Sequence, residues 1–183
     1  MDGSNPVLYV VACGGYPAQD LPRFAQWAQT EGWRVCVVAT PKGREFLDTA
    51  ALQQLTGYPV RHDYKHPDDP DVLPPANAML VAPATFNTVN KLAAGISDTL
   101  ALGLVNEAIG LGIPVIAAPW PNKALATRRP FRESVERLRA EGVRFVLDDE
   151  NLPEPASGRP GAAAFPWQPI HAQIISVRQE LSR

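Results

Sequence analysis

The stretch VLYVVACGG, residues 7–15, is a continuous apolar run that ends at two glycines. A half-exposed strand alternates apolar and polar residues, whereas a strand covered on both faces is apolar throughout, as in parallel sheets. Residues 7–12 are therefore predicted to form a buried strand. The pattern returns in RVCVVAT, residues 34–40, and between the two runs lies an apolar helical stripe that stops at Gly32. This succession of strand, helix and strand indicates a parallel sheet crossed by helices.

The alternation continues along the rest of the chain. Asp20 is expected to cap the first helix, with Pro22 in its first turn. The further strands are expected at 79–82, 113–118 and 143–147, and the further helices at 45–55, 88–94, 97–111, 130–141 and 170–181. This order predicts an α/β fold, a single-domain doubly wound and mostly parallel sheet of the Rossmann or flavodoxin-like type with helices on both faces. Ligands of such sheets bind beyond the carboxyl ends of the strands.

The length of 183 residues suits one domain with a single core. Residues 1–150 are expected to form that core, and residues 151–183 a flap and closing helix of the same domain. Residues 61–75 contain four prolines and four aspartates, which predicts a polar crossing loop. Residues 151–169 contain five prolines and are predicted to be a mobile flap or an extended connection.

Charge excludes a large group of partners. The formal net charge is -2, and the one dense basic cluster, Arg128, Arg129 and Arg132, is diluted by Glu133 and Glu136. Binding to nucleic acid through a basic face needs clustered lysine and arginine without such acidic neighbours. We therefore expect a solvated helix face here and no nucleic-acid partner.

Hydropathy and cysteine content bear on the compartment. A membrane-spanning helix needs about 18 or more consecutive apolar residues, and the sequence has no such run. Residues 1–6 are polar, unlike the start of a secretory signal. No membrane contact and a cytoplasmic location are expected. Cys13 and Cys36 both lie in apolar runs, and buried thiols are expected rather than a disulfide.

The third turn after a strand, PATFNTV at residues 83–89, carries the most specific pattern. Thr85, Asn87 and Thr88 directly follow a buried strand, and polar groups there are costly to bury unless they find hydrogen-bond partners. A flat heteroaromatic ring with donors and acceptors would supply them, since an asparagine amide can both donate and accept. The alternative is a helix N-cap cluster, which explains one or two of these residues.

The first two turns contain residues suited to an anion. Gly14 and Gly15 follow the first strand, where backbone amides at a helix start can approach a phosphate, and a third glycine that would indicate a dinucleotide fingerprint is missing. Thr40, Lys42 and Gly43 follow the second strand. The simpler alternatives are tight turns that need glycine, a capping Thr40 and a solvated Lys42.

The fourth turn, PWPN at residues 119–122, also ends a strand. Trp120 is either part of the core or a platform for a ring. Asn122 is either a helix cap or an amide that orients a substrate.

The run PATFNTVNKLAAGISDTL, residues 83–100, closely resembles the flavin-binding segment of the homo-oligomeric flavin-containing cysteine decarboxylases. This family includes phosphopantothenoylcysteine decarboxylase and the lantibiotic peptide decarboxylases, and the resemblance extends over residues 7–147. It implies an FMN cofactor held by residues of the first three turns and the helices that follow. By position these are Gly14, Gly15, Thr40, Lys42, Gly43, Pro83, Ala84, Thr85, Asn87, Thr88, Lys91 and Asp98.

The resemblance also implies a reaction, oxidative decarboxylation of a cysteine-type small molecule or peptide. Asn122 corresponds to the family's substrate-binding asparagine, although Pro121 stands where relatives have methionine. Relatives use a histidine before the third turn as the catalytic base, and counting back from Pro83 places that position at Asp68–Asp69. The nearest histidines are His66 and His62, each either the base or a solvent-facing loop residue.

Two other functions remain open at this stage. One is an FMN-binding protein without decarboxylase activity, acting as an accessory or regulatory subunit. The other is a flavin prenyltransferase-like enzyme, which would need an additional phosphate site. Residues 157–167 contain no cysteine, so reduction of an intermediate by a flap cysteine, as in some relatives, is excluded. Relatives form trimers or multiples of them, which implies a homo-oligomer here; no metal site is expected.

Overall fold

The sheet is parallel throughout and has five strands in the order β2-β1-β3-β4-β5. It is seen in a computed structural model that describes residues 5–66 and 68–183. The strands are β1 Val7–Ala12, β2 Arg34–Ala39, β3 Ala78–Ala84, β4 Val115–Pro119 and β5 Arg144–Phe145. All residues of the central β1 and β3 are buried, which explains why their sequences are apolar without alternation.

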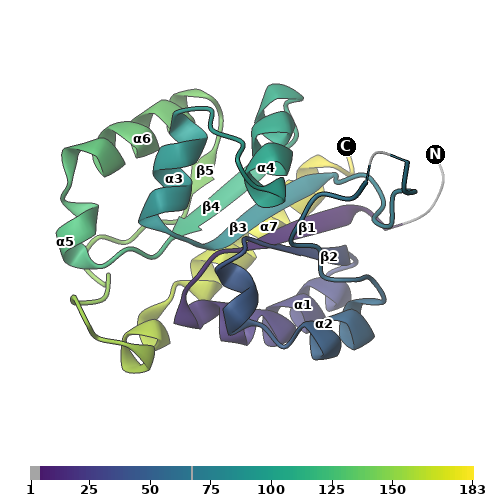
Figure 1. Cartoon of the computed structure of the whole chain (residues 1–183), viewed down its shortest axis with the longest axis horizontal. Coiled ribbons are helices and arrows are strands. Elements are labelled where there is room, and N and C mark those ends of the chain that lie inside the picture. The colour runs from purple at the N-terminus through teal and green to yellow at the C-terminus, as the bar shows by residue number, and fades with distance from the viewer. Residues whose placement is uncertain (1–4, 67) are drawn as a thin grey trace.

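Helices cover both faces of the sheet, as predicted (Figure 1). In that view α3 Phe86–Ala93, α4 Leu100–Gly110 and α6 Arg129–Ala140 lie above the sheet, and α1 Leu21–Thr30 and α2 Thr49–Thr56 lie below it. The last helix, α7 Trp167–Glu180, packs its buried face into the same core cluster as α1 and α2. The structure thereby confirms a doubly wound α/β fold.

Short helical turns occupy the carboxyl edge of the sheet. The 3₁₀ helix η1 Tyr16–Asp20 follows β1, and η2 Gly43–Phe46 follows β2. The short α5 Lys123–Ala126 follows β4, and η3 Arg159–Ala164 lies in the proline-rich segment before α7. The turns that the sequence singled out for chemistry therefore all start from this one edge.

One predicted helix is wrong in its start, and the predicted cap of the first helix is right in position only. Residues 45–55 do not form one helix, because η2 ends at Phe46 and α2 begins at Thr49. The Asp48 carboxylate accepts a hydrogen bond from the Ala51 N–H at 3.0 Å and so starts α2. Asp20 is the N-cap residue of α1, as predicted, but its side chain makes no cap hydrogen bond; α1 directly continues η1, and the Leu21 N–H donates to the Ala18 carbonyl.

Other bounds shift for local reasons. The helix expected from residue 97 begins at Leu100, because Thr99 is its N-cap and accepts from the Leu102 N–H at 3.3 Å. β5 has two residues rather than the five expected, since only Arg144 and Phe145 pair with β4. The closing helix begins at Trp167, three residues before the expected start.

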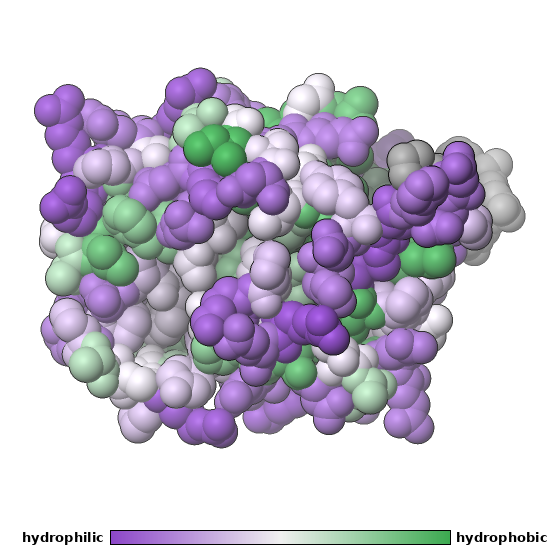
Figure 2. All heavy atoms as spheres, viewed as in Figure 1, coloured by the Kyte–Doolittle hydropathy of each residue, from purple (hydrophilic) through white to green (hydrophobic). Residues whose placement is uncertain are grey.

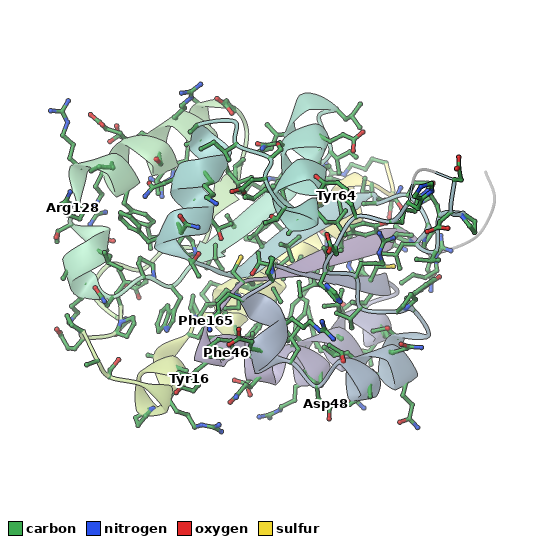
Figure 3. The ribbon with its side chains drawn as sticks, viewed as in Figure 1. Tyr16, Phe46, Asp48, Tyr64, Arg128 and Phe165 are labelled. Carbon is green, nitrogen blue, oxygen red and sulfur yellow. The ribbon has the colours of Figure 1, made fainter. Side chains whose placement is uncertain are left out.

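The surface shown in Figure 2 is polar over most of its area, with apolar side chains scattered among polar ones. Arg128 and Arg129 are exposed, as expected, and Figure 3 shows Arg128 at the outer edge of the molecule. None of the helices in the described part of the chain is long and apolar enough to cross a membrane.

Candidate functional site

One cavity of about 390 Å³ opens at the carboxyl edge of the sheet. Turns after three strands and the start of α4 form its wall. The lining residues are Gly14, Thr40, Pro41, Lys42, Thr85, Asn87, Thr88, Lys91, Thr99 and Leu102. Seven of them belong to the predicted cofactor set: Gly14, Thr40, Lys42, Thr85, Asn87, Thr88 and Lys91. The fold therefore brings these seven residues into one cavity, although they lie up to 77 positions apart in the sequence (Gly14 to Lys91).

The third turn is held by its own side chains. Thr85 is the N-cap of α3 and accepts from the Thr88 N–H at 3.1 Å, and the two hydroxyl oxygens lie 2.9 Å apart. The buried Thr88 hydroxyl donates to Cys13 Sγ at 3.3 Å. The N-cap alternative thus accounts for Thr85 and Thr88. Asn87 is exposed, and its amide has no hydrogen-bond partner among the described residues, so it is the free polar group of the turn.

The second turn is packed against the first strand by backbone contact. The Thr40 N–H donates to the Ala12 carbonyl at 2.9 Å, and Thr40 Oγ1 accepts from the Gly43 N–H at 2.9 Å. Gly43 is buried, and a Cβ added there would lie 2.1 Å from the Ala12 carbonyl oxygen. Only glycine fits at position 43, because the second turn approaches the end of β1 so closely there. Gly43 does not line the cavity, but it allows the second turn to approach the end of β1 closely.

Gly14 has a different role in the cavity wall. A Cβ at this position would lie 2.9 Å from Lys42 Cγ, so the missing side chain leaves room for the lysine stem. Lys42 Nζ pairs with Glu45 at 2.6 Å, and both side chains are largely exposed. Such a pair is weak in water and leaves the ammonium available to an anion.

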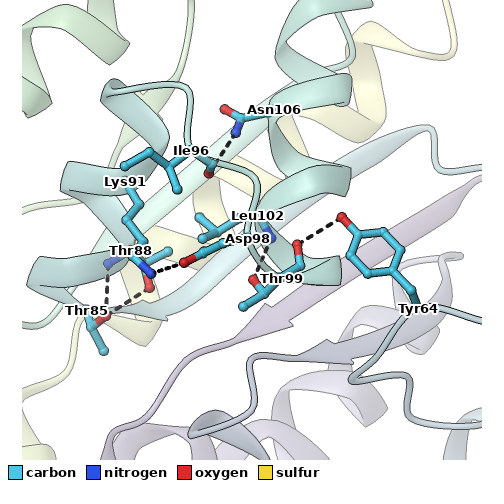
Figure 4. Close-up of polar contacts among 9 residues, drawn as sticks. All are labelled: Tyr64, Thr85, Thr88, Lys91, Ile96, Asp98, Thr99, Leu102 and Asn106. Atoms are coloured by element: carbon cyan, nitrogen blue, oxygen red, sulfur yellow. Dashed lines mark hydrogen bonds and ion pairs between the residues drawn. The ribbon is translucent and has the colours of Figure 1, made fainter.

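Lys91 and Asp98 form an ion pair at the rim, with Nζ and Oδ2 2.5 Å apart (Figure 4). Lys91 lines the cavity, and Asp98 is not one of the lining residues. The Asn106 amide donates to the Ile96 carbonyl at 3.2 Å and to Ser97 Oγ at 2.8 Å, which fixes the loop that carries Asp98. The pair therefore positions the lysine.

Part of the wall was not predicted from the sequence. Thr99 and Leu102 line the cavity from the start of α4. The Tyr64 hydroxyl donates to the Thr99 carbonyl, as Figure 4 shows, with a distance of 3.2 Å, and it also lies against Gly103, where a Cβ would be 2.3 Å from the phenol oxygen. Tyr64 thereby ties the crossing loop to the cavity rim.

The two candidate histidines lie outside the lining of this cavity, as far as the described residues show. His62 is half-buried and follows Arg61, whose carbonyl accepts from the Ala39 N–H at 2.7 Å beside the end of β2. His66 is exposed, and its Nδ1 lies 3.5 Å from Asp68 Oδ2. His62 is therefore the one held between two anchors of the loop, Arg61 and Tyr64.

Asn122 lies in a second, smaller pocket of about 220 Å³. The residues that also line it include Gly15, Tyr16, Trp120, Pro153, Glu154 and residues 156–158. Asn122 is the N-cap of α5, and its Oδ1 accepts from the Leu125 N–H at 2.9 Å. This leaves its amide N–H₂ free to donate. Of the two alternatives for Asn122, capping is observed and substrate contact stays a prediction.

Tyr16 stands between the first turn and the proline-rich segment. Its ring meets Phe46 edge to face with centroids 5.6 Å apart, and the Arg159 guanidinium lies 5.7 Å from its centroid. Figure 3 labels Tyr16 and Phe46 close to each other. Trp120 packs edge to face on the buried Phe165 at 5.2 Å. The segment predicted as a flap or connection thus covers the Asn122 pocket.

The remaining predicted residues lie inside the sheet. Pro83 and Ala84 are buried in β3, where the Ala82–Pro83 peptide is cis. The Pro83 carbonyl accepts from the Cys13 N–H at 3.2 Å, and the Ala84 carbonyl accepts from the Trp120 N–H at 2.8 Å. They connect the third turn to the first and fourth turns.

Both cysteines are buried free thiols, as predicted. Burial raises the pKa of Cys13, although the hydrogen bond from Thr88 opposes the shift. Burial also raises the pKa of Cys36 to about 12. Because the thiolate is the reactive form, neither side chain is suited to act as a nucleophile.

A larger cavity, of about 440 Å³, lies between α1, η3 and α7. Trp27 and His171 stack in its wall with ring centroids 3.7 Å apart, and burial lowers the pKa of His171. No predicted site residue lines it. Size alone therefore does not select the functional site, and the convergence of the strand-end turns favours the 390 Å³ cavity.

Residues 4–178 match the model of the family described as Flavoprotein. The chain is 26% identical over 148 residues to the coenzyme A biosynthesis bifunctional protein CoaBC of Thermococcus kodakarensis, covering 73% of this chain and 34% of that protein. It thus spans about a third of the length of that relative. It is 29% identical over 121 residues to a probable phosphopantothenoylcysteine decarboxylase of Streptococcus mutans, covering 63% of this chain and 67% of that protein.

Among solved structures, the FMN-dependent cysteine decarboxylase TvaF from thioviridamide biosynthesis is similar with a TM-score of 0.70 and 28% identity. The match covers 86% of this chain and 98% of TvaF.

Proposed function

Because the chain belongs to the Flavoprotein family, we propose that it binds FMN in the 390 Å³ cavity and oxidatively decarboxylates a cysteine-type small molecule or peptide. The observation that carries the proposal is the convergence of three strand-end turns on one cavity. Relatives that share the fold act in the same chemical class, namely TvaF and the probable phosphopantothenoylcysteine decarboxylase.

The residues of the cavity fit the cofactor. Gly14 gives room to the stem of Lys42, and Thr40 and Lys42 offer a hydroxyl and a cation for a phosphate. Asn87 supplies an unpaired amide that can donate to and accept from a ring edge. Lys91, fixed by Asp98, adds a second cation. These residues would hold and orient FMN.

FMN, when bound, supplies the two-electron acceptor for oxidation of the cysteine side chain that precedes loss of CO₂. The protein supplies orientation. The free amide N–H₂ of Asn122 would donate to the substrate carboxylate in the second pocket, and the segment over that pocket would exclude water. His62 or His66 would accept a proton from the substrate.

The purified chain should be yellow, absorb near ~450 nm and release FMN on denaturation, because the cofactor carries the chromophore. Incubation with 4′-phosphopantothenoylcysteine or with peptides ending in cysteine should release CO₂. Mass spectrometry of the released ligand identifies FMN, and mass spectrometry of the product detects the loss of CO₂. A colourless chain that does not take up added FMN would contradict the proposal at its base.

Replacement of the histidines tests the base. His62→Asn should lower turnover by about 10²-fold or more if His62 takes the proton, and His66→Asn should do so if His66 does. FMN content should stay at the wild-type level in both variants, since neither side chain lines the cavity. Unchanged turnover in both variants would remove histidine from the mechanism.

A second candidate function is an FMN-binding protein without decarboxylase activity. The observation that favours it is the position of His62 and His66 outside the cavity lining. CO₂ release measured on the FMN-loaded chain separates the two functions. The third possibility, prenyl transfer, has less support, because Arg128 is exposed on an outer helix and Arg129 pairs with Glu133 at 2.7 Å.

We also propose a homo-oligomer, a trimer or a multiple of it, with residues 151–183 part of the same domain as the core of residues 1–150. Ile170, Ile174 and Val177 of the closing helix are fully buried, which supports the second statement. Light scattering on the purified chain should give a mass of three chains of 19.9 kDa or a multiple, and a monomer mass would contradict the assembly.

A further inference from the structure

Lys123 and Glu154 form an ion pair at the pocket that contains Asn122. Lys123 Nζ lies 2.7 Å from Glu154 Oε1, and the Lys123 N–H donates to the Pro153 carbonyl at 2.9 Å. Lys123 directly follows Asn122, and Glu154 belongs to the segment that covers the pocket. A carboxylate of the chain itself therefore lies at the place where a substrate carboxylate is proposed to bind.

The donors at this place suit one carboxylate. Asn122 keeps its N–H₂ free because its carbonyl oxygen caps α5. Lys123, the next residue, does not line the pocket, but its ammonium contacts Glu154, which does. An amide N–H and an ammonium together can hold both oxygens of one carboxylate through a charge-assisted and a neutral hydrogen bond. While Glu154 contacts Lys123, the Lys123 ammonium already has a carboxylate partner.

The pair is weak enough to exchange. The Lys123 side chain is 43% exposed and that of Glu154 67% exposed. Ion pairs of this exposure contribute about 0.2–1 kcal/mol, so an incoming carboxylate with a second donor on Asn122 can replace Glu154 at little cost. Displacement of Glu154 frees the covering segment from one of its contacts.

We propose that Glu154 is an internal competitor for the substrate carboxylate and that Lys123 is the residue for which the two compete. The inference rests on the proposed function and adds a specificity-determining pair to it. Acids are favoured over the corresponding amides, because a neutral amide cannot take the place of Glu154 on the ammonium.

The test uses the full-length FMN-loaded chain and N-acetyl-L-serine, with N-acetyl-L-serinamide as the neutral control. The acid carries the acylated amino group and the carboxylate common to both proposed substrate types, and it lacks the thiol that reacts. Dissociation constants come from NMR titration, and KM values from CO₂ release. The variants are Glu154→Gln, Lys123→Gln and the double variant. Glu133→Gln is the matched control, because its exposed pair with Arg129 also measures 2.7 Å.

Glu154→Gln should bind the acid up to about fivefold more tightly, the ratio that corresponds to a lost competitor worth at most about 1 kcal/mol. Its affinity for the amide should stay the same. Lys123→Gln should bind the acid about tenfold more weakly, and adding Glu154→Gln to it should have no further effect, because the competition has been removed. Glu133→Gln should match the wild type for both probes.

Equal affinities of Glu154→Gln and wild type for the acid would overturn the inference, as would a parallel change for acid and amide. No measurable binding of the acid to any variant, together with CO₂ release from a cysteine substrate, would also overturn it and leave the proposed function standing. If the FMN-loaded wild type neither binds the acid nor releases CO₂, the proposed function fails as well.

Discussion

The Gly43→Ala chain is expected to lose about 3 kcal/mol of folding free energy and most of its FMN. The new Cβ would lie 2.1 Å from the Ala12 carbonyl oxygen and 2.9 Å from the Ala12 carbonyl carbon. Both are backbone atoms in the central strand β1, so no side-chain rotation can relieve the contact. The turn that carries Thr40 and Lys42 must move away from the Gly14 turn, which displaces the part of the cavity wall that Thr40 and Lys42 form.

Gly110→Ala is the matched control for this change. Gly110 ends α4, and a Cβ there meets nothing within 4 Å, so alanine should be neutral or slightly stabilising. Urea unfolding of the cofactor-free chains measures stability, and absorbance after purification measures FMN content. If Gly43→Ala and the wild type unfold at the same urea concentration, Gly43 does not approach the Ala12 carbonyl as closely as 2.1 Å implies.

The second large effect is expected for Asn87→Ala. FMN should bind about 10- to 100-fold more weakly, because a buried flavin edge would lose a partner for its donor or acceptor, a loss of about 1–3 kcal/mol. Folding stability should not change, since Asn87 is exposed and its amide bonds to none of the described residues. The prediction thus separates cofactor affinity from folding.

Fluorescence titration of the cofactor-free chain with FMN gives the dissociation constant. Gln53→Ala, which removes an exposed amide from α2 far from the cavity lining, serves as control and should match the wild type. Wild-type affinity in Asn87→Ala would move the flavin away from the third turn. Loss of stability would instead mean that the asparagine has a structural partner.

The fold could be predicted because its signals are local. The runs at residues 7–12 and 35–39 are apolar throughout, which is the sequence pattern of a strand buried on both faces. The division of residues 45–55 into η2 and α2 also had a local signal, since Asp48 followed by Thr49 is a strong helix start.

The site was predictable only in part. The turns after the strands gave seven residues of the cavity lining, because parallel strands bring their carboxyl ends to one edge. The wall from α4 was missed, since the contact of Tyr64 with Gly103 joins residues 39 positions apart and has no periodicity. The positions of His62 and His66 depend on how a proline-rich loop crosses the sheet, which no local rule fixes.

The bonds between Thr85, Thr88 and Cys13 have a consequence for handling the protein. These groups satisfy one another without any ligand, so the wall of the cavity needs no bound molecule to keep its shape. Removal of the cofactor should therefore leave a folded apoprotein. Such an apoprotein can be reconstituted with modified flavins, such as 5-deazaflavin mononucleotide or isotopically labelled FMN, which turns an ordinary capping network into a route for cofactor exchange.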